Sequence, residues 1–255
     1  MLSGLIILDK PSNLTSFDCV ERVKKIFGVE KAGHTGTLDF KVTGVLLILL
    51  GEARKLAPFF EKMDKTYLGV MHLHKEVSRE KLENALEKFK GEIIQLPPRR
   101  SRVKRVPRKR KIYKLEIKKI ENKDVTLLVE CEHGTYIRKL FWDIGQELKV
   151  GAHMKYLRRI AVNGFKEEEA VSLEELEKEK EKYLIKNEEI VSRLNIRKIV
   201  LGKEMEKRIR NGAPIFFKDE TLKNNEKVAL FVENKLVAIG CFKGNKIKIE
   251  RVLLV

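Results

Sequence analysis

The sequence predicts an α+β fold, in which a mixed β-sheet with interspersed helices precedes a small β-rich unit. In the first 180 residues, strand-like segments with alternating apolar residues are interspersed with segments of helical periodicity, without the regular alternation of a doubly wound sheet. A charge-rich, linker-like stretch follows at residues 180–192, and three β-rich runs lie beyond it. We therefore expect two domains, at residues 1–185 and 190–255, and expect the second to be a small β-barrel.

The first half of the chain is expected to form three strands and three helices. Residues 4–10 read as a buried strand, and a Pro/Asn turn leads to a helix that opens at Thr15 or Ser16. A glycine-rich turn at 33–44 runs into an apolar strand at 45–50, and Gly51 begins the next helix. Residues 65–74 have strand composition. Ser78 then starts the helix with the clearest apolar periodicity.

The second half is predicted from patterns of the same kind. Segments 112–120 and 124–137 alternate and are joined by a short turn, which is typical of an antiparallel pair with one solvated face. An amphipathic helix at 137–148 and a strand at 152–162 follow. Ser172 and Glu175 form a capping box that opens a charged helix. Beyond the linker we expect a helix at 201–210 and strands at 228–232, 235–242 and 246–254.

The charge of the chain favours a polyanionic partner. Its 54 Lys and Arg residues exceed its 37 Asp and Glu residues, so the net charge is +17. A charge-rich surface suited to high temperature is the alternative, but ion-pair networks mix both signs and do not require so large an excess. Nucleic acid is the polyanion that this balance indicates.

Several functional classes lack their sequence signals. The chain has no P-loop, dinucleotide fingerprint or nucleophile elbow. Its three cysteines share no metal-ligand spacing, and the His72/His74 pair has no third ligand at a usable spacing. We therefore expect neither a metal site nor a cofactor. No apolar run is long enough to span a membrane and no secretory signal is evident, so a cytoplasmic protein without membrane contact is expected.

Asp39 is the leading candidate for catalysis. It lies in a turn where Gly33, Gly36 and Gly44 permit close backbone approach, and the apolar strand follows at once. From the spacing alone, an ordinary turn or capping aspartate is the simpler interpretation. The alternative is a carboxylate presented rigidly by the strand behind it.

Three further features have both a structural and a functional interpretation. Arg138 is either a surface arginine or a partly buried fork that holds a carboxylate ionised. Tyr67 is either a core residue of a strand or a surface on which a base stacks. Nine of the thirteen residues 99–111 are basic, so this segment is a solvated loop, an import signal or an RNA-backbone contact made by Arg105, Arg108 and Arg110.

Five blocks of sequence together resemble the TruB/dyskerin family of pseudouridine synthases. They are ILDKPSNLTS at 7–16, GHTGTLDFKVTGVL at 33–46, KTYLGVMHLH at 65–74, GEIIQLPPRRSRVKRVPRKRKIYKLEI at 91–117 and GTYIRKLFWDIGQELKVGAHMKYLRR at 134–159. The resemblance covers roughly residues 5–170, and the order of the blocks makes it far more specific than any single block. The KVTG motif, the basic block and the short path from residue 74 to residue 78 resemble the archaeal–eukaryotic branch, whose members are catalytic subunits of H/ACA RNA-guided particles.

The resemblance implies a mixed-sheet catalytic domain followed by a PUA-like RNA-binding β-barrel. It implies that Asp39 is the nucleophile, that Tyr67 stacks on the base and that Arg138 pairs with the aspartate. Leu157 matches the leucine packed under the site, and His34 a histidine beside the target nucleotide. The family reaction converts uridine in rRNA or tRNA to pseudouridine and needs no cofactor or metal. The implied partners are a guide RNA, the substrate RNA and the small accessory proteins of the particle.

The chain departs from the family pattern in a few places. Phe40 and Leu47 stand where prolines are usual, although neither position carries a group that the reaction needs. The N-terminal segment is short, and the lysine-rich tail of the eukaryotic members is missing, so an archaeal-type protein is expected. Two alternatives to the guided enzyme remain: a stand-alone synthase acting on the TΨC arm of tRNA, and a non-catalytic RNA-binding scaffold.

Overall fold

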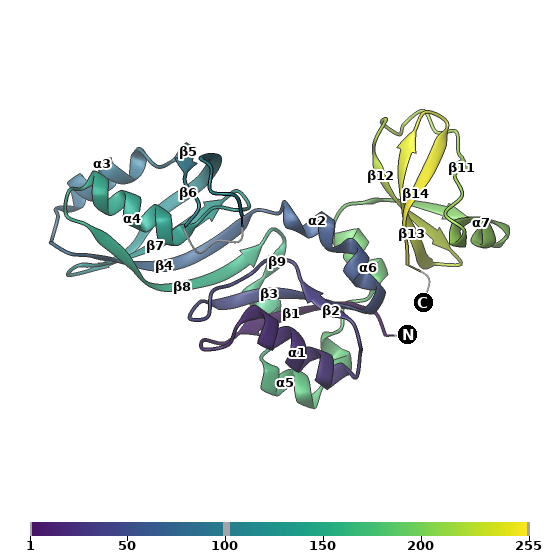
Figure 1. Cartoon of the computed structure of the whole chain (residues 1–255), viewed down its shortest axis with the longest axis horizontal. Coiled ribbons are helices and arrows are strands. Elements are labelled where there is room, and N and C mark those ends of the chain that lie inside the picture. Colours follow the sequence, from purple (N-terminus) through teal and green to yellow (C-terminus); the bar gives the residue numbers. More distant parts are fainter. Residues whose placement is uncertain (1, 99–102, 254–255) are drawn as a thin grey trace.

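The computed structural model describes residues 2–98 and 103–253, which form two β-sheets and the helices around them (Figure 1). The strands are β1 (Gly4–Lys10), β2 (Ala32–His34), β3 (Thr43–Leu50), β4 (Lys65–Leu73), β5 (Gly91–Gln95), β6 (Arg108–Glu121), β7 (Asp124–Cys131), β8 (Ala152–Val162), β9 (Phe165–Lys166), β10 (Arg197–Leu201), β11 (Ile215–Phe216), β12 (Lys227–Val232), β13 (Lys235–Lys243) and β14 (Lys246–Val252). The α-helices are α1 (Ser16–Phe27), α2 (Ala57–Glu61), α3 (Arg79–Glu87), α4 (Ile137–Glu147), α5 (Leu173–Lys178), α6 (Asn187–Arg193) and α7 (Glu206–Arg210).

The larger sheet has the order β1-β3-β8-β4-β7-β6-β5, with β2 added beside β3 and β9 beside β8. All of its pairings are antiparallel except the one between β3 and β8, so the sheet is mixed as predicted. The smaller sheet, β10-β12-β13-β14-β11, is curled and lies at one end of the long axis of the molecule (Figure 1). The α+β fold class is confirmed.

Strands β1 and β3 each contain a long apolar run, because both of their faces are buried there. Alternate residues of a strand point to opposite faces, so each strand contributes to two cores. On one face, Ile6, Leu8 and Leu46 pack with the apolar stripe of α1. On the other face, Leu5, Ile7 and Leu47 join a second core, which also includes residues of α6, β12 and β13. The smaller sheet is therefore packed onto the larger one through apolar side chains.

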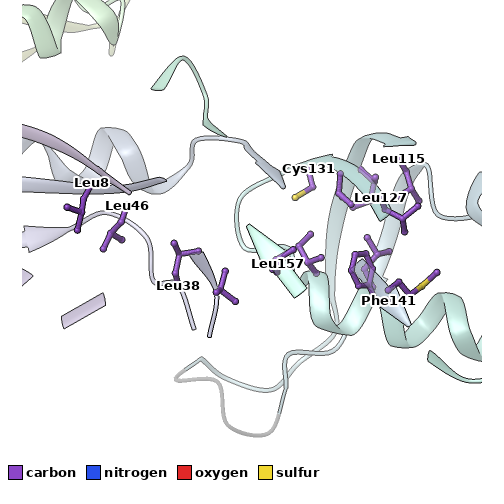
Figure 2. Packing of buried hydrophobic residues seen from close by; sticks show 14 of the residues in the cluster. Leu8, Leu38, Leu46, Leu115, Leu127, Cys131, Phe141 and Leu157 are labelled. Carbon is purple, nitrogen blue, oxygen red and sulfur yellow. The ribbon is translucent and has the colours of Figure 1, made fainter. Parts of the chain in front are cut away.

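Helices α3 and α4 cover one face of the other half of the large sheet (Figure 1). The helix predicted from Ser78 is present, and the Ser78 side chain accepts a hydrogen bond from the Lys81 amide. Figure 2 shows Phe141 of α4 among Leu115, Leu127 and Leu157, which come from three strands. Since α4 is held by this packing, its N-terminal turn has a defined position over the sheet.

The two halves of the large sheet meet at a short parallel contact, where Thr43 and Gly44 of β3 lie beside Arg158 and Arg159 of β8. Gly44 has φ +100°, and a Cβ atom there would lie 2.2 Å from the Arg159 carbonyl oxygen. Only glycine allows this close approach. The glycine-rich turn therefore enters the sheet directly beside β8.

Most of the strands and helices predicted from the sequence are present, but several details differ. From Gly51 the chain forms a 3₁₀ helix to Leu56 before α2 begins, because Pro58 starts a new helix. The helix expected at 201–210 is shorter, since residues 197–201 form β10 and a 3₁₀ turn precedes α7. The short strands β2, β5, β9 and β11 were not predicted. The proposed domain boundary at 185–190 stays a prediction.

Candidate active site

Asp39 lies in the turn between β2 and β3. The turn is anchored on both sides of the aspartate, because Leu38 and Val42 are buried in the core. The Ser16 hydroxyl accepts a hydrogen bond from the Leu38 amide (2.9 Å) and donates one to the Leu38 carbonyl (3.1 Å). The Val42 amide donates to the Asp39 carbonyl (3.0 Å). The carboxylate thus projects from a backbone that is fixed on both sides.

Arg138 is the ion-pair partner of Asp39, with Nη2 of the arginine facing Oδ2 of the aspartate. Both side chains are more than half exposed, at 57% and 59% of their full accessible surface. The pair is therefore open to solvent, where such interactions contribute at most about 1 kcal/mol to stability. The ion pair between an arginine and the candidate carboxylate is present. Arg138 is an exposed residue, however, and not the partly buried fork that the sequence analysis gave as one of its two interpretations.

Gln95 fixes the chain segment that carries Arg138. This buried side chain at the end of β5 donates to the Tyr136 carbonyl (3.2 Å) and accepts from the Tyr136 amide (3.0 Å). Tyr136 precedes α4, so these two bonds hold the start of the helix two residues before Arg138. Nothing in the sequence patterns pointed to Gln95, because its role depends on a segment far away along the chain.

Tyr67 and Leu157 lie on the same face of the β4–β8 pair. Tyr67 is the register partner of Arg159, and Gly69 is the partner of Leu157. A Cβ atom at Gly69 would lie 2.8 Å from the Phe141 ring and 3.0 Å from the Leu157 side chain, so glycine leaves room for both. Tyr67 is partly buried, and desolvation raises the pKa of its hydroxyl group.

Arg159 connects this sheet face with the Asp39 turn. It is 2% exposed. Its Nε donates to the Val45 carbonyl (2.7 Å) and its Nη2 to the Gly36 carbonyl (3.0 Å). Arg159 is also the register partner of Tyr67 in the β4–β8 pair, so the two side chains lie on the same face of the sheet. Burial lowers the pKa of the arginine, and Tyr67 partly opposes that shift. The sequence analysis did not single out Arg159.

Lys10 holds the other side of the turn. Its side chain is fully buried, and Nζ donates to the carbonyls of Pro11 (2.8 Å), Val42 (2.8 Å) and, more weakly, Phe40 (3.4 Å). Desolvation lowers the pKa of this amine. A buried cation whose hydrogen-bond partners are all carbonyls is costly, so its presence indicates that the position of the turn matters. In the sequence, Lys10 stood out only as part of the ILDKPSNLTS block at 7–16.

His34 lies at the end of β2 and is partly buried. Its Nδ1 atom is buried without a hydrogen-bond partner. Desolvation lowers the pKa of the ring, and the charge of Arg159 lowers it further, so the neutral imidazole is favoured. An unpartnered buried nitrogen is uncommon, and it leaves one hydrogen-bonding group free for a ligand.

The described part of the basic segment approaches the start of α4. Arg108 pairs with Gln95 in the β5–β6 ladder. A Cβ atom at Gly134 would lie 2.9 Å from Nη2 of Arg110, so the Arg110 guanidinium packs on the turn before α4. Arg105 is exposed in the segment that leads to β6. Residues 99–102 of the predicted RNA-contact segment lie outside the described residues.

The histidine pair considered as metal ligands lies at the other end of β4. His72 pairs with Asp124 (Nδ1 to Oδ1, 2.5 Å), and His74 Nε2 lies 3.1 Å from His153 Nδ1. Within residues 2–98 and 103–253, no group of three or more His, Cys, Asp or Glu side chains is arranged to hold a metal ion. In the same ranges, every helix is too short or too polar to cross a membrane.

Comparison with protein families gives two matches. The model of the N-terminal domain of TruB family pseudouridylate synthases matches residues 24–80 and 74–137. The model of the C-terminal domain of tRNA pseudouridylate synthase B matches residues 138–205.

Among curated proteins, a probable tRNA pseudouridine synthase B of Korarchaeum cryptofilum is 40% identical over 264 residues, spanning 98% of this chain and 79% of the relative. A protein of the same name from Methanopyrus kandleri is 50% identical over 176 residues, 69% of this chain. In that case the match spans only about half of the relative, 52% of its length.

Two solved structures share the fold over almost the whole chain. A crystal structure of a Cbf5-Nop10-Gar1 complex has a chain with a TM-score of 0.84 and 36% identity, covering 98% of this chain and 85% of that one. A structure of an H/ACA RNP bound to a substrate RNA containing 2′-deoxyuridine has a chain with a TM-score of 0.82 and 34% identity, with coverages of 99% and 85%.

Proposed function

The chain belongs to the TruB family of pseudouridine synthases, and from that membership we propose that it isomerises uridine to pseudouridine in RNA. One observation carries the proposal: the exposed ion pair of Asp39 and Arg138, on a turn that buried cations hold in place. In the reaction the N1–C1′ bond breaks and a C5–C1′ bond forms. C5 loses its proton and N1 gains one, so no oxidant or reductant is needed.

Asp39 supplies the nucleophilic carboxylate that promotes cleavage of the glycosidic bond. A base in a stacked helix is inaccessible, so the target uridine must be flipped out of the RNA to reach it. Arg138 orients the carboxylate through their ion pair. RNA covering the site would exclude water, and the ion pair would then become stronger than it is in the open protein.

The neighbouring side chains bind the flipped nucleotide. Tyr67 stacks on the uracil, and Leu157 supports it from the sheet below. The unpartnered Nδ1 of His34 offers a hydrogen bond to the nucleotide. Arg105, Arg108 and Arg110 bind the RNA backbone beside the site, where Arg110 already packs on the turn before α4.

We further propose that the chain acts as the catalytic subunit of an H/ACA guide RNA-protein particle on rRNA or tRNA. Both solved structures come from such complexes or from their protein components. The path from β4 to α3 is short, which leaves no room for an RNA-gripping insertion. The curled C-terminal sheet would bind the guide RNA as a PUA-like domain, and the catalytic domain would bind small accessory proteins.

A stand-alone enzyme for the TΨC arm of tRNA is the second candidate, and the names of the curated relatives favour it. The deciding assay measures pseudouridine in a TΨC stem-loop transcript with the full chain alone, and then with an H/ACA guide RNA and the accessory proteins. Product with the chain alone supports the stand-alone enzyme. Product only in the assembled particle supports the guided one.

The catalytic assignment is tested with Asp39→Asn, which removes the charge and preserves the size of the side chain. We expect product formation to fall by at least about 1,000-fold, because the nucleophile is lost. Asp124→Asn is the matched control, since Asp124 is a paired carboxylate near the far end of β4. If Asp39→Asn and Asp124→Asn both work at the wild-type rate, Asp39 is not the nucleophile, and a non-catalytic scaffold becomes the better interpretation.

A further inference from the structure

We infer that Arg159 is a positioning residue for the reaction, because one buried guanidinium sets the Asp39 turn against the Tyr67 side chain. This inference rests on the proposed function for its kinetic consequences, but its structural basis is independent of it. Arg159 touches neither the carboxylate of Asp39 nor the solvent-exposed side of the site. It acts through the backbone of the turn, which it binds at two carbonyls, and through its place directly opposite Tyr67 in the sheet.

The contacts of Arg159 join parts of the chain that are far apart in sequence. Gly36 precedes Asp39 by three residues and Val45 follows it by six, so the two carbonyl bonds hold the turn on both sides of the nucleophile. The third neighbour, Tyr67, belongs to β4 on the other half of the sheet. Few main-chain pairs join the halves directly, since the β3–β8 pairing involves only Thr43 and Gly44 of β3.

Because Arg159 is buried, the geometry of its hydrogen bonds must be closely kept. A cation that is 2% exposed and bonded to neutral carbonyls is stable only if every donor finds its partner with good geometry. The guanidinium is a rigid planar fork, so moving one partner carbonyl disturbs the other contacts. A lysine has a single point charge and cannot reproduce the two divergent bonds to Gly36 and Val45. Arginine is therefore required by shape as well as by charge.

The predicted effect of losing the fork is a small displacement of Asp39 relative to the base bound on Tyr67. Misplacing a catalytic group by about 1 Å can reduce the rate about 100-fold while substrate binding is preserved. RNA affinity should hardly change, because the basic residues that contact the backbone lie elsewhere. The expected signature is therefore a lower kcat for the RNA substrate with an almost unchanged KM.

The test compares Arg159→Lys with Arg158→Lys in the full chain, assembled as the wild type requires for activity. Arg158 is the next residue of the same strand, but it pairs with Asp9 and Glu167. For Arg159→Lys we expect kcat to fall about 30- to 100-fold and KM to change less than about threefold. For Arg158→Lys we expect both constants to stay within about twofold of the wild-type values, because its bonds go to the side chains of Asp9 and Glu167 and not to the carbonyls of the Asp39 turn.

Hydrogen exchange provides a second readout that does not require activity. The amides of Thr35, Leu38 and Val42 are hydrogen-bonded within the turn or to its surroundings. In Arg159→Lys these three amides should exchange at least about tenfold faster, while the amides of α4 stay protected. In Arg158→Lys they should exchange as in the wild type. If the wild type makes no pseudouridine, the proposed function fails, but the exchange comparison still decides whether Arg159 holds the turn.

Three outcomes would overturn the inference. The first is an Arg159→Lys variant with wild-type kcat, and the second is one whose turn amides exchange at the wild-type rate. The third is failure to fold of both Arg159→Lys and Arg159→Gln while Arg158→Lys folds, since Arg159 would then be required for folding and not for positioning.

Discussion

The family resemblance implies prolines at the positions of Phe40 and Leu47, and the surroundings of these two residues are very different. Phe40 is 51% exposed beside Asp39, and its carbonyl accepts a hydrogen bond from the Asn13 amide (2.9 Å). Leu47 is buried in the middle of β3, in the core shared with the smaller sheet. The loss of a proline constraint therefore affects a surface turn in one case and a central strand in the other.

We predict that Phe40→Pro leaves kcat for the RNA substrate within about threefold of wild type, because the turn is already held by its backbone contacts. Leu47→Pro should lower the free energy of unfolding by about 3 kcal/mol or more, since it removes a core side chain and a strand amide. Pseudouridine assays and denaturant unfolding measure the two effects. A tenfold loss of kcat in Phe40→Pro would mean that the aromatic side chain takes part in the reaction or in RNA binding.

At the scale of the elements, strand β4 carries an aromatic residue of the site, Tyr67, and a buried cation, Lys65, two positions apart. Tyr67 faces the site, whereas Lys65 is buried at the start of the strand and donates to the carbonyls of Met63 and Glu61 (3.4 Å for Glu61). These bonds join the end of α2 to β4. Desolvation, together with a smaller contribution from the charge of Arg159, lowers the pKa of Lys65 to about 8. The amine therefore loses its proton at a lower pH in the folded protein than in the unfolded chain.

This shift predicts how stability depends on pH. Between pH 8 and about 10.5 the unfolded chain binds more protons at Lys65 than the folded protein does, so this group makes stability rise with pH. The shift corresponds to about 3 kcal/mol. In Lys65→Met that rise should be missing when unfolding free energies at pH 7.5 and 10.5 are compared. Lys62→Met, an exposed position, is the control for total charge, and equal pH profiles of wild type and Lys65→Met would contradict the prediction.

At the scale of the whole molecule, the excess of positive charge favours association with a polyanion such as RNA. With a net charge of +17, the chain attracts RNA before any specific contact forms. Arg110 packs on the turn before α4, Arg108 pairs with Gln95 in the β5–β6 ladder, and Arg105 is exposed in the segment that leads to β6. By contrast, Lys114, Lys118 and Lys119 lie farther along β6, where they pair with glutamates.

Replacing Arg105, Arg108 and Arg110 by alanine should weaken RNA binding and reduce its salt dependence. Each lost phosphate contact lowers the slope of log affinity against log salt by about 0.7 to 0.9, so the slope should fall by about 2. The matched control replaces Lys114, Lys118 and Lys119, which removes the same charge from another place. Equal salt slopes for the two triple variants would contradict the assignment of the arginines as phosphate contacts.

The sequence by itself determined the order and type of most elements. Apolar periodicity and capping residues are local signals, and for this reason α1, α3, α4 and the strands β1, β3, β4 and β8 were predicted close to their observed positions. The sequence also indicated the family, because the five family-like blocks between residues 7 and 159 occur in one chain and in the expected order. Asp39, Tyr67 and Arg138 were named from those motifs, and the structure brings Asp39 and Arg138 together as an ion pair.

Only the tertiary structure decided how the candidate site is supported. Arg159, Lys10 and Gln95 have no periodic signal, because each acts through main-chain carbonyl or amide groups of a segment far away along the chain. Strands β2, β9 and β11 were not predicted for a related reason, since runs of two or three residues carry no alternating pattern and their extended form depends on pairing with a neighbouring strand. Burial and long-range hydrogen bonds form only when distant segments of the chain come into contact, so they cannot be predicted from a local pattern of residues.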